Sequence, residues 1–127
     1  MKKVINTKKA PAPIGPYNQA ILAGNTLYIS GQIAINSETG ELVQDSIVLE
    51  TKQVIKNLDA ILAEAGFQLN DVVKTSIFLS NMDYFATVNE IYAEYFSNET
   101  APARETVAVS TLPKNVNVEI SAIAVKN

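Results

Sequence analysis

The sequence of 127 residues contains no cysteine and no histidine, and only one of its ten basic residues is an arginine. Without cysteine there is no disulfide framework and no thiolate chemistry. Without histidine the chain lacks the usual general base and the commonest metal ligand, so we expect no metal site. Any chemistry must therefore use carboxylates, one arginine, lysines, tyrosines, hydroxyl groups and the backbone. The cytoplasm is the expected location.

Long apolar runs and a basic surface are also missing. No run approaches the roughly 18 residues that cross a bilayer, and the lysines near the N-terminus precede no apolar segment, so we expect neither membrane association nor a signal peptide. The formal net charge is −3 and the lysines are scattered. Because nucleic-acid binders usually present a basic face, no nucleic-acid partner is expected. The length and the 47% hydrophobic content predict one globular domain over residues 1–127.

The pattern of apolar and turn residues predicts a hairpin, a helix, a strand, a second helix and two further strands. Gly24-Asn25 separates the two strands of the hairpin. The other expected elements are an extended entry at Ala10–Tyr17, a loop at Asn36–Gly40, a helix from about Ser46 to Ala65 capped by Asp45 or Ser46 and ended by Gly66, a strand over Asp71–Leu79, a helix from near Asp83, and strands around Glu105–Val109 and Val116–Val125. The second helix is expected to turn inward Phe85, Val88, Ile91, Tyr92, Tyr95 and Phe96.

These elements predict an α+β domain in which a mixed sheet carries both helices on one face. The opposite face of the sheet would then need cover, and self-association is the simplest way to provide it. An oligomer is therefore expected. The short loop LPKNV favours a hairpin between the last two strands.

Two charged residues stand out near the end of the chain. Arg104 is the only arginine, and Glu119, the only acidic residue after Glu105, interrupts the apolar strand VNVEISAIAV. Both could be solvated charges or a structural ion pair, which is common. Alternatively, Arg104 could bind a carboxylate through two parallel hydrogen bonds, which lysine cannot imitate. Glu119 could then orient water or transfer protons.

Three further places are ambiguous when each is considered alone. Tyr17, in the segment IGPY, could be a packing aromatic or a site residue. Ser30-Gly31 interrupts an apolar strand, either as a bulge or as a place where a ligand approaches the backbone. Asn89 lies among aromatic residues of the second helix and is either exposed or functional.

Taken together, the segments IGPYNQA, YISGQI, FATVNEIYAEYF, APARETVAV and LPKNVNVEISAIAV resemble the Rid (YjgF-type) family, and most of all its RidA branch of 2-iminobutanoate/2-iminopropanoate deaminases. The resemblance extends from about residue 3 to the C-terminus. It implies a chorismate-mutase-like α+β fold and a homotrimer with active sites between subunits. It also implies that the final strand lies beside the first core strand and the 71–79 strand, which replaces the hairpin favoured above.

The resemblance also implies roles for individual residues. Arg104 would bind the carboxylate of a small 2-imino or enamine acid, and Glu119 would position or activate the attacking water. Tyr17 would close the pocket across the subunit interface. Further polar contacts would come from Ser30, Gly31, Asn89 and Thr106. The substrates would be unstable products of pyridoxal-phosphate-dependent serine and threonine dehydratases, and the protein itself would need no cofactor.

One departure from the family concerns Thr106, because many relatives have cysteine there. Asn115 is a second departure, because relatives often have glycine or aspartate there.

Two other functions compete with the deaminase. A non-catalytic trimer that binds 2-oxo acids or related metabolites would need Arg104 but not Glu119. A ribonuclease or translation inhibitor is disfavoured by the missing histidine and the negative charge.

Overall fold

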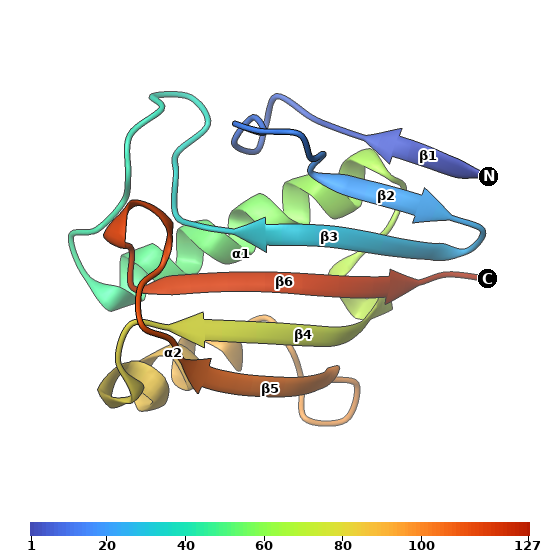
Figure 1. Ribbon diagram of the computed structural model, residues 1–127. Helices are drawn as coiled ribbons and strands as arrows, with labels where there is room; N and C mark the ends of the chain where they lie inside the picture. The colour runs from blue at the N-terminus through green and yellow to red at the C-terminus, as the bar shows by residue number, and fades with distance from the viewer.

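Six strands form one mixed sheet, and both α-helices cover the same face of it (Figure 1). The computed structural model describes residues 1–127. The strand order is β1-β2-β3-β6-β4-β5, and only β4 and β5 pair in parallel. The elements are β1 (Lys2–Ile5), β2 (Ala20–Ala23), β3 (Thr26–Gln32), α1 (Ile47–Glu64), the 3-10 turn η1 (Leu69–Asp71), β4 (Val72–Leu79), η2 (Met82–Tyr84), α2 (Phe85–Tyr92), β5 (Ala103–Ala108), η3 (Pro113–Asn115) and β6 (Val118–Val125).

The hairpin and the first helix agree with the sequence. β2 and β3 pair in antiparallel register around Gly24, whose φ of +62° suits a residue without a side chain. Ser46 caps α1 by accepting a hydrogen bond from the backbone N–H of Leu49 at 3.0 Å. The helix ends just before Gly66, which has a φ of +79°.

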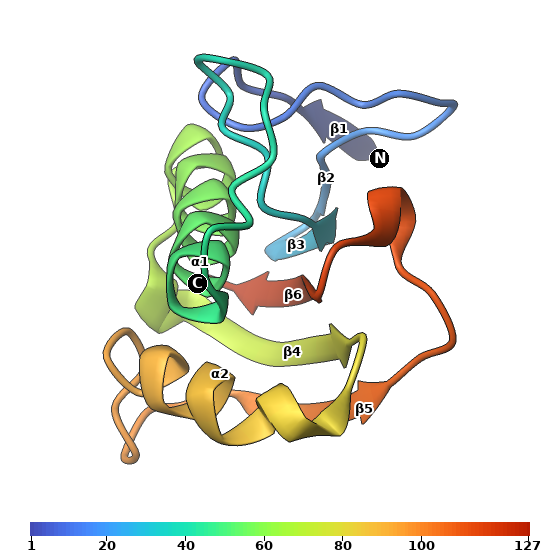
Figure 2. The same cartoon turned by 90° about the vertical axis from the view of Figure 1, so that its left-hand side faces the viewer.

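The last strand lies in the middle of the sheet. β6 pairs with β3 on one side and with β4 on the other, as the resemblance implied. A hairpin between the last two strands is therefore wrong. Instead β5 joins the far side of β4 after the α2 crossover, and such a crossover connection is what parallel pairing requires. Figure 2 shows β5 at the lower edge of the sheet, with α2 packed against it.

Two expectations need correction. The N-terminal strand β1 was not predicted, because the segment KKVI has two lysines and no alternation to mark it. The second helix was expected to bury Phe85 and Tyr95, but their side chains are 37% and 38% exposed. Tyr95 lies beyond the end of α2, which has only eight residues, and Phe85 is the first residue of the helix. Val88, Ile91, Tyr92 and Phe96 are buried as expected.

Strict alternation in β6 separates the two faces of the sheet. Val118, Ile120, Ala122 and Ala124 are buried on the helix side, and the residues between them are only partly buried on the helix-free side. Across β1, β2, β3 and β6, the paired residues on the helix-free side form an apolar row: Val4, Ile21, Tyr28 and Ile123. This face carries exposed apolar groups that no element of the chain covers. Neither helix combines the length and apolar character that a membrane span requires.

Candidate functional site

The residues singled out from the sequence fall into two groups on opposite faces of the sheet. Arg104 and Thr106 point from β5 toward the helix side, next to α2. Glu119 lies on the helix-free side of β6 and shares a cavity with Tyr17 and Gly31. We call Arg104 and Thr106, together with the neighbouring rings of α2, the arginine half-site. Glu119, Tyr17 and Gly31 form the glutamate half-site.

Arg104 rests on two aromatic rings of α2. Its guanidinium carbon lies 4.9 Å from the centre of the Tyr92 ring and 5.8 Å from that of Phe85, both within the range of cation–π attraction. Arg104 makes no ion pair, because the only one in the chain joins Lys74 and Glu105. The rings hold the guanidinium without occupying its fork of N–H donors, which stays free to bind an anion.

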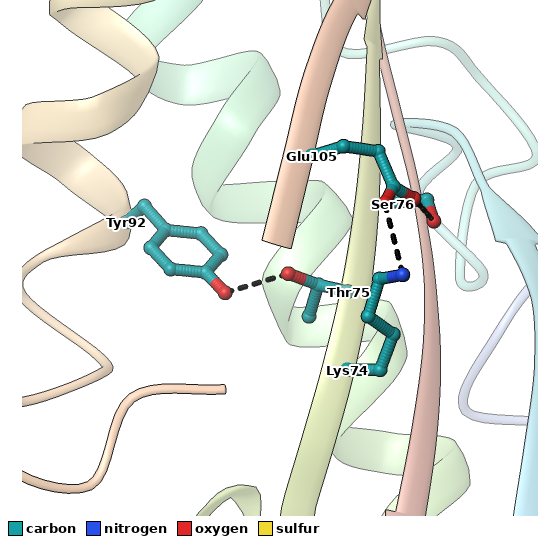
Figure 3. Close-up of polar contacts among 5 residues, drawn as sticks. All are labelled: Lys74, Thr75, Ser76, Tyr92 and Glu105. Carbon is teal, nitrogen blue, oxygen red and sulfur yellow. Dashed lines mark hydrogen bonds and ion pairs between the residues drawn. The ribbon is translucent and has the colours of Figure 1, made fainter. Parts of the chain in front are cut away.

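The ring under Arg104 is itself fixed. The Tyr92 hydroxyl and the Thr75 hydroxyl share a hydrogen bond of 2.8 Å, and the Tyr92 ring stacks on Phe96 with centroids 4.5 Å apart. Figure 3 shows Tyr92 reaching from α2 to Thr75, while Lys74, Ser76 and Glu105 interact on the other side of β4. Burial raises the pKa of Tyr92 above its ordinary value, so its hydroxyl stays neutral.

Two other predicted residues lie on the elements that carry the arginine half-site, Thr106 on β5 and Asn89 on α2. The Thr106 hydroxyl follows Arg104 on the same side of β5 and is the only buried side-chain polar atom without a hydrogen-bond partner. Because protein atoms enclose this hydroxyl, its desolvation is not offset by any hydrogen bond. Asn89 is exposed on α2, and its spacing from Phe85 and Tyr92 puts it on the same helix face as the two rings.

Glu119 sits directly above Gly31. A Cβ atom at position 31 would lie 2.4 Å from a carboxyl oxygen of Glu119, so only glycine leaves room for this side chain. The β3–β6 register also shifts between Ile29 and Gln32, which makes Ser30-Gly31 a bulge. The absence of a side chain at Gly31 therefore permits both the irregular backbone of the bulge and the close approach of the Glu119 carboxylate.

The Glu119 carboxyl is half-buried and makes no ion pair. Burial alone raises its pKa above the ordinary value, because removal of water disfavours the charged form. A desolvated carboxylate without a partner is a stronger proton acceptor than a solvated one. It faces a cavity of about 90 Å³, whose lining includes Tyr17, Gly31, Pro113 and Lys114.

Tyr17 and Ser30 play different parts in the glutamate half-site. The Tyr17 ring is 49% exposed at the cavity, and its hydroxyl accepts only a long bond of 3.5 Å from the Ile14 N–H. It is available for a ligand or another chain. The Ser30 hydroxyl, in contrast, donates to the backbone oxygen of Asn18 at 2.7 Å. Ser30 thus anchors the segment that follows Tyr17, and its side chain does not line the cavity.

Sequence reasoning missed a residue that fixes the start of β6. Glu50 of α1 is fully buried and accepts three hydrogen bonds, from the backbone N–H groups of Asn117 and Val118 at 2.7 and 2.9 Å and from the Asn117 amide at 3.1 Å. These bonds hold the strand one residue before Glu119. Acidic residues are common in the first turn of a helix, so the sequence does not distinguish Glu50 from an ordinary surface residue.

The turn before β6 contains Asn115, where the sequence departs from the family, and its backbone conformation is unusual. Lys114 and Asn115 have φ values of +55° and +56°, and they are the only non-glycine residues with positive φ. Asparagine tolerates this left-handed conformation better than most residues, whereas lysine is strained in it. The turn directs Lys114 to the rim of the glutamate half-site.

Together the two half-sites offer an anion-binding guanidinium and a basic carboxylate, but on opposite faces of one chain. A ligand that needs both must meet them in two different chains. The chemistry available is recognition of a carboxylate together with proton transfer to or from water.

Comparison with known proteins identifies relatives along almost the whole chain. The family model described as Endoribonuclease L-PSP matches residues 7–126. A RutC family protein of Pyrococcus horikoshii is 56% identical over 126 residues, which are 99% of each chain. The 2-iminobutanoate/2-iminopropanoate deaminase of the mouse is 50% identical over 126 residues, 99% of this chain and 93% of the mouse protein. The crystal structure of a Rid family protein from Yersinia pestis superposes with a TM-score of 0.96 at 52% identity, covering 99% of this chain and 100% of the other.

Proposed function

The chain belongs to the endoribonuclease L-PSP family, the family of the Rid proteins, and we propose that it hydrolyses 2-imino and 2-enamine acids to 2-oxo acids and ammonia. The observation that carries this proposal is the Glu119 carboxyl, desolvated, unpaired and placed over Gly31 at a small cavity. A protein that only binds a carboxylate needs Arg104 but has no use for such a base. The mouse relative, which is named as an imine deaminase, supports the same reaction.

In the proposed reaction Arg104 holds the substrate carboxylate through two parallel hydrogen bonds. Glu119 takes a proton from water while the water oxygen bonds to the imine carbon, and this proton passes to the imine nitrogen to give a carbinolamine. Glu119 then takes the remaining hydroxyl proton and passes it to the nitrogen as the C–N bond breaks, so that ammonia leaves, the added oxygen becomes the carbonyl of a 2-oxo acid and the carboxylate is regenerated. Imines hydrolyse readily in water, so orientation and modest acid–base help are enough. No step requires a cofactor.

The active form would be a homotrimer of the chorismate-mutase-like type, in which the arginine half-site of one subunit faces the glutamate half-site of the next. Two observations support this arrangement. Arg104 and Glu119 lie on opposite faces of the sheet within one chain, and the apolar row on the helix-free face has no cover. Tyr17 would complete the pocket from the glutamate side, with Asn89 and the backbone at Thr106 on the arginine side.

The proposed substrates are 2-aminoacrylate, 2-iminopropanoate and 2-iminobutanoate, the unstable products of serine and threonine dehydratases. The experiment couples a purified threonine dehydratase to this protein and follows 2-oxobutanoate formation in the presence of semicarbazide, which traps the imine. The proposal expects 2-oxobutanoate to form faster than the trap captures the imine. Complete capture by the trap at every protein concentration would refute the deaminase.

A non-catalytic trimer that binds 2-oxo acids and regulates a partner is the alternative. The free guanidinium of Arg104 suits it equally well. The same assay separates the two, since a regulatory protein would bind 2-oxobutanoate in calorimetry without accelerating its formation. A ribonuclease, the activity in the family description, is tested by incubating homogeneous protein with RNA, and we expect no cleavage above that of an Arg104→Ala control.

A further inference from the structure

A wide groove adjoins the small cavity of the glutamate half-site. It has a volume of about 870 Å³ and runs along the segment between β1 and β2 and the loop after β3, both at the top of Figure 2. The groove and the cavity share six lining residues: Pro11, Ala12, Ile14, Gln19, Ile35 and Lys114. The groove and the cavity over Glu119 therefore adjoin along these residues.

The groove is positively charged within an acidic protein. Its 14 lining residues include Lys8 and Lys114 but no aspartate or glutamate, although acidic residues outnumber basic ones by 13 to 10 in the chain. Neither lysine takes part in an ion pair. Two lysines without ion-pair partners give this concave, partly apolar surface a positive potential, which attracts an anionic group.

The walls of the groove are held in place before any ligand binds. Gln19, only 2% exposed, fixes one wall by accepting from the Thr7 N–H at 2.6 Å and donating to the backbone oxygens of Thr7, Ala10 and Pro11. The other side is the η3 turn, where backbone bonds from Asn115 to Leu112 and from Val116 to Pro113 hold Lys114 in its left-handed conformation. Preformed walls reduce the entropy lost on binding.

We propose that this groove receives a second carboxylate of the substrate, so that the protein accepts 2-imino dicarboxylic acids in addition to small monocarboxylic ones. The inference rests on the proposed function. In this arrangement the imine carbon sits in the cavity over Glu119, and the distal carboxylate enters the groove that Lys8 and Lys114 line. The two lysines are the specificity-determining residues for that acidic side chain, and Arg104 of the adjoining subunit keeps the first carboxylate.

Calorimetry with 2-oxoglutarate and 2-oxobutanoate, the stable 2-oxo counterparts of the two classes, tests the groove. A charged hydrogen bond lost from a distal carboxylate corresponds to roughly a tenfold change in affinity. We expect the wild type to bind 2-oxoglutarate about tenfold more tightly than 2-oxobutanoate. Lys8→Ala and Lys114→Asn should each remove most of this preference. Asparagine is chosen at position 114 because it tolerates the left-handed backbone.

Lys3→Ala is the matched control, because it removes the same charge from an exposed lysine of β1 that does not line the groove. It should leave the affinity ratio unchanged. Equal affinities for both acids in the wild type, undetectable 2-oxoglutarate binding, or a preference that survives both groove substitutions would overturn the inference. The coupled assay tests the proposed function separately. If 2-iminobutanoate is not hydrolysed in that assay, the deaminase proposal fails, whatever calorimetry shows about the groove.

Discussion

Arg104 and Glu119 point to opposite faces of the same sheet. Arg104 projects from β5 onto the aromatic rings of α2, while Glu119 projects from β6 over Gly31 on the helix-free face. Along β4 their pairing partners, Thr75 and Phe78, are three residues apart. One chain therefore cannot bring both groups to one small ligand, and the account requires two chains at each site.

Arg104→Lys should keep the fold and the oligomer but lose most turnover. Lysine keeps the charge and can still lie over Tyr92, but it cannot form two parallel bonds to a carboxylate. The lost charge-assisted bond corresponds to about 1.5–3 kcal/mol, roughly a ten- to hundredfold decrease in kcat/KM. The coupled dehydratase assay measures this decrease. Wild-type rates in this variant would show that Arg104 does not bind the substrate carboxylate.

The pH profile should report the raised pKa of Glu119. The carboxyl must be ionised to accept a proton, so activity is present above its pKa in the folded protein and is lost as the pH falls through it. Because burial raises that pKa, the acid limb of kcat/KM should have its midpoint above the ordinary glutamate value of about 4.5.

Glu119→Gln is the control for this profile. It should abolish the acid limb and most of the activity while leaving 2-oxobutanoate binding largely intact, because the amide keeps the shape but accepts no proton. If calorimetry shows that binding is lost together with activity, Glu119 positions the ligand and is not the base.

Gly31→Ala should inactivate the protein without unfolding it. The added Cβ would meet the flexible end of Glu119 at 2.4 Å and push the carboxylate aside. A displacement of about 1 Å can reduce turnover on the order of 100-fold. A double-mutant cycle with Glu119→Ala is the check, because Gly31→Ala should lower turnover no further once the carboxylate and its clash with Cβ are both gone. Additive losses would mean that Gly31 acts independently of Glu119.

Thr106→Val should raise stability and lower activity only slightly. In the free protein the buried hydroxyl has no partner, and replacing it with a methyl group removes a desolvation cost of about 1 kcal/mol while retaining a β-branched side chain. Urea unfolding measures the gain. Turnover should fall far less than in Arg104→Ala. A loss of activity as large as that of Arg104→Ala would make the hydroxyl a direct participant.

Local signals in the sequence predicted most elements correctly. Ser46 and Gly66 mark the two ends of α1, and Gly24 marks the turn of the hairpin. These signals are local because caps and left-handed turns depend on single residue types. The order of the strands could not be obtained in this way. Placing β6 between β3 and β4 depends on long-range pairing, and only the resemblance predicted it.

The sequence singled out Arg104 and Glu119 but did not indicate that they lie on opposite faces of the sheet. Arg104 and Thr106 are two residues apart in β5, so strand alternation by itself places them on one side of the strand. Alternation could not show whether Arg104 and Glu119 lie on the same face of the sheet. That depends on how β5 and β6, which are not neighbours, are placed in the sheet. The support from Glu50 was equally invisible, since its partners lie 67 and 68 residues along the chain.

Subunit mixing tests the central claim most directly, namely that each site takes Arg104 from one chain and Glu119 from another. Arg104→Ala and Glu119→Gln, each inactive alone, are unfolded together in equal amounts and refolded as mixed oligomers. Random assembly should give intact sites at about one interface in four, so imine hydrolysis should return to roughly a quarter of the wild-type rate. Mixed oligomers that form but stay as inactive as the two parents would contradict the account.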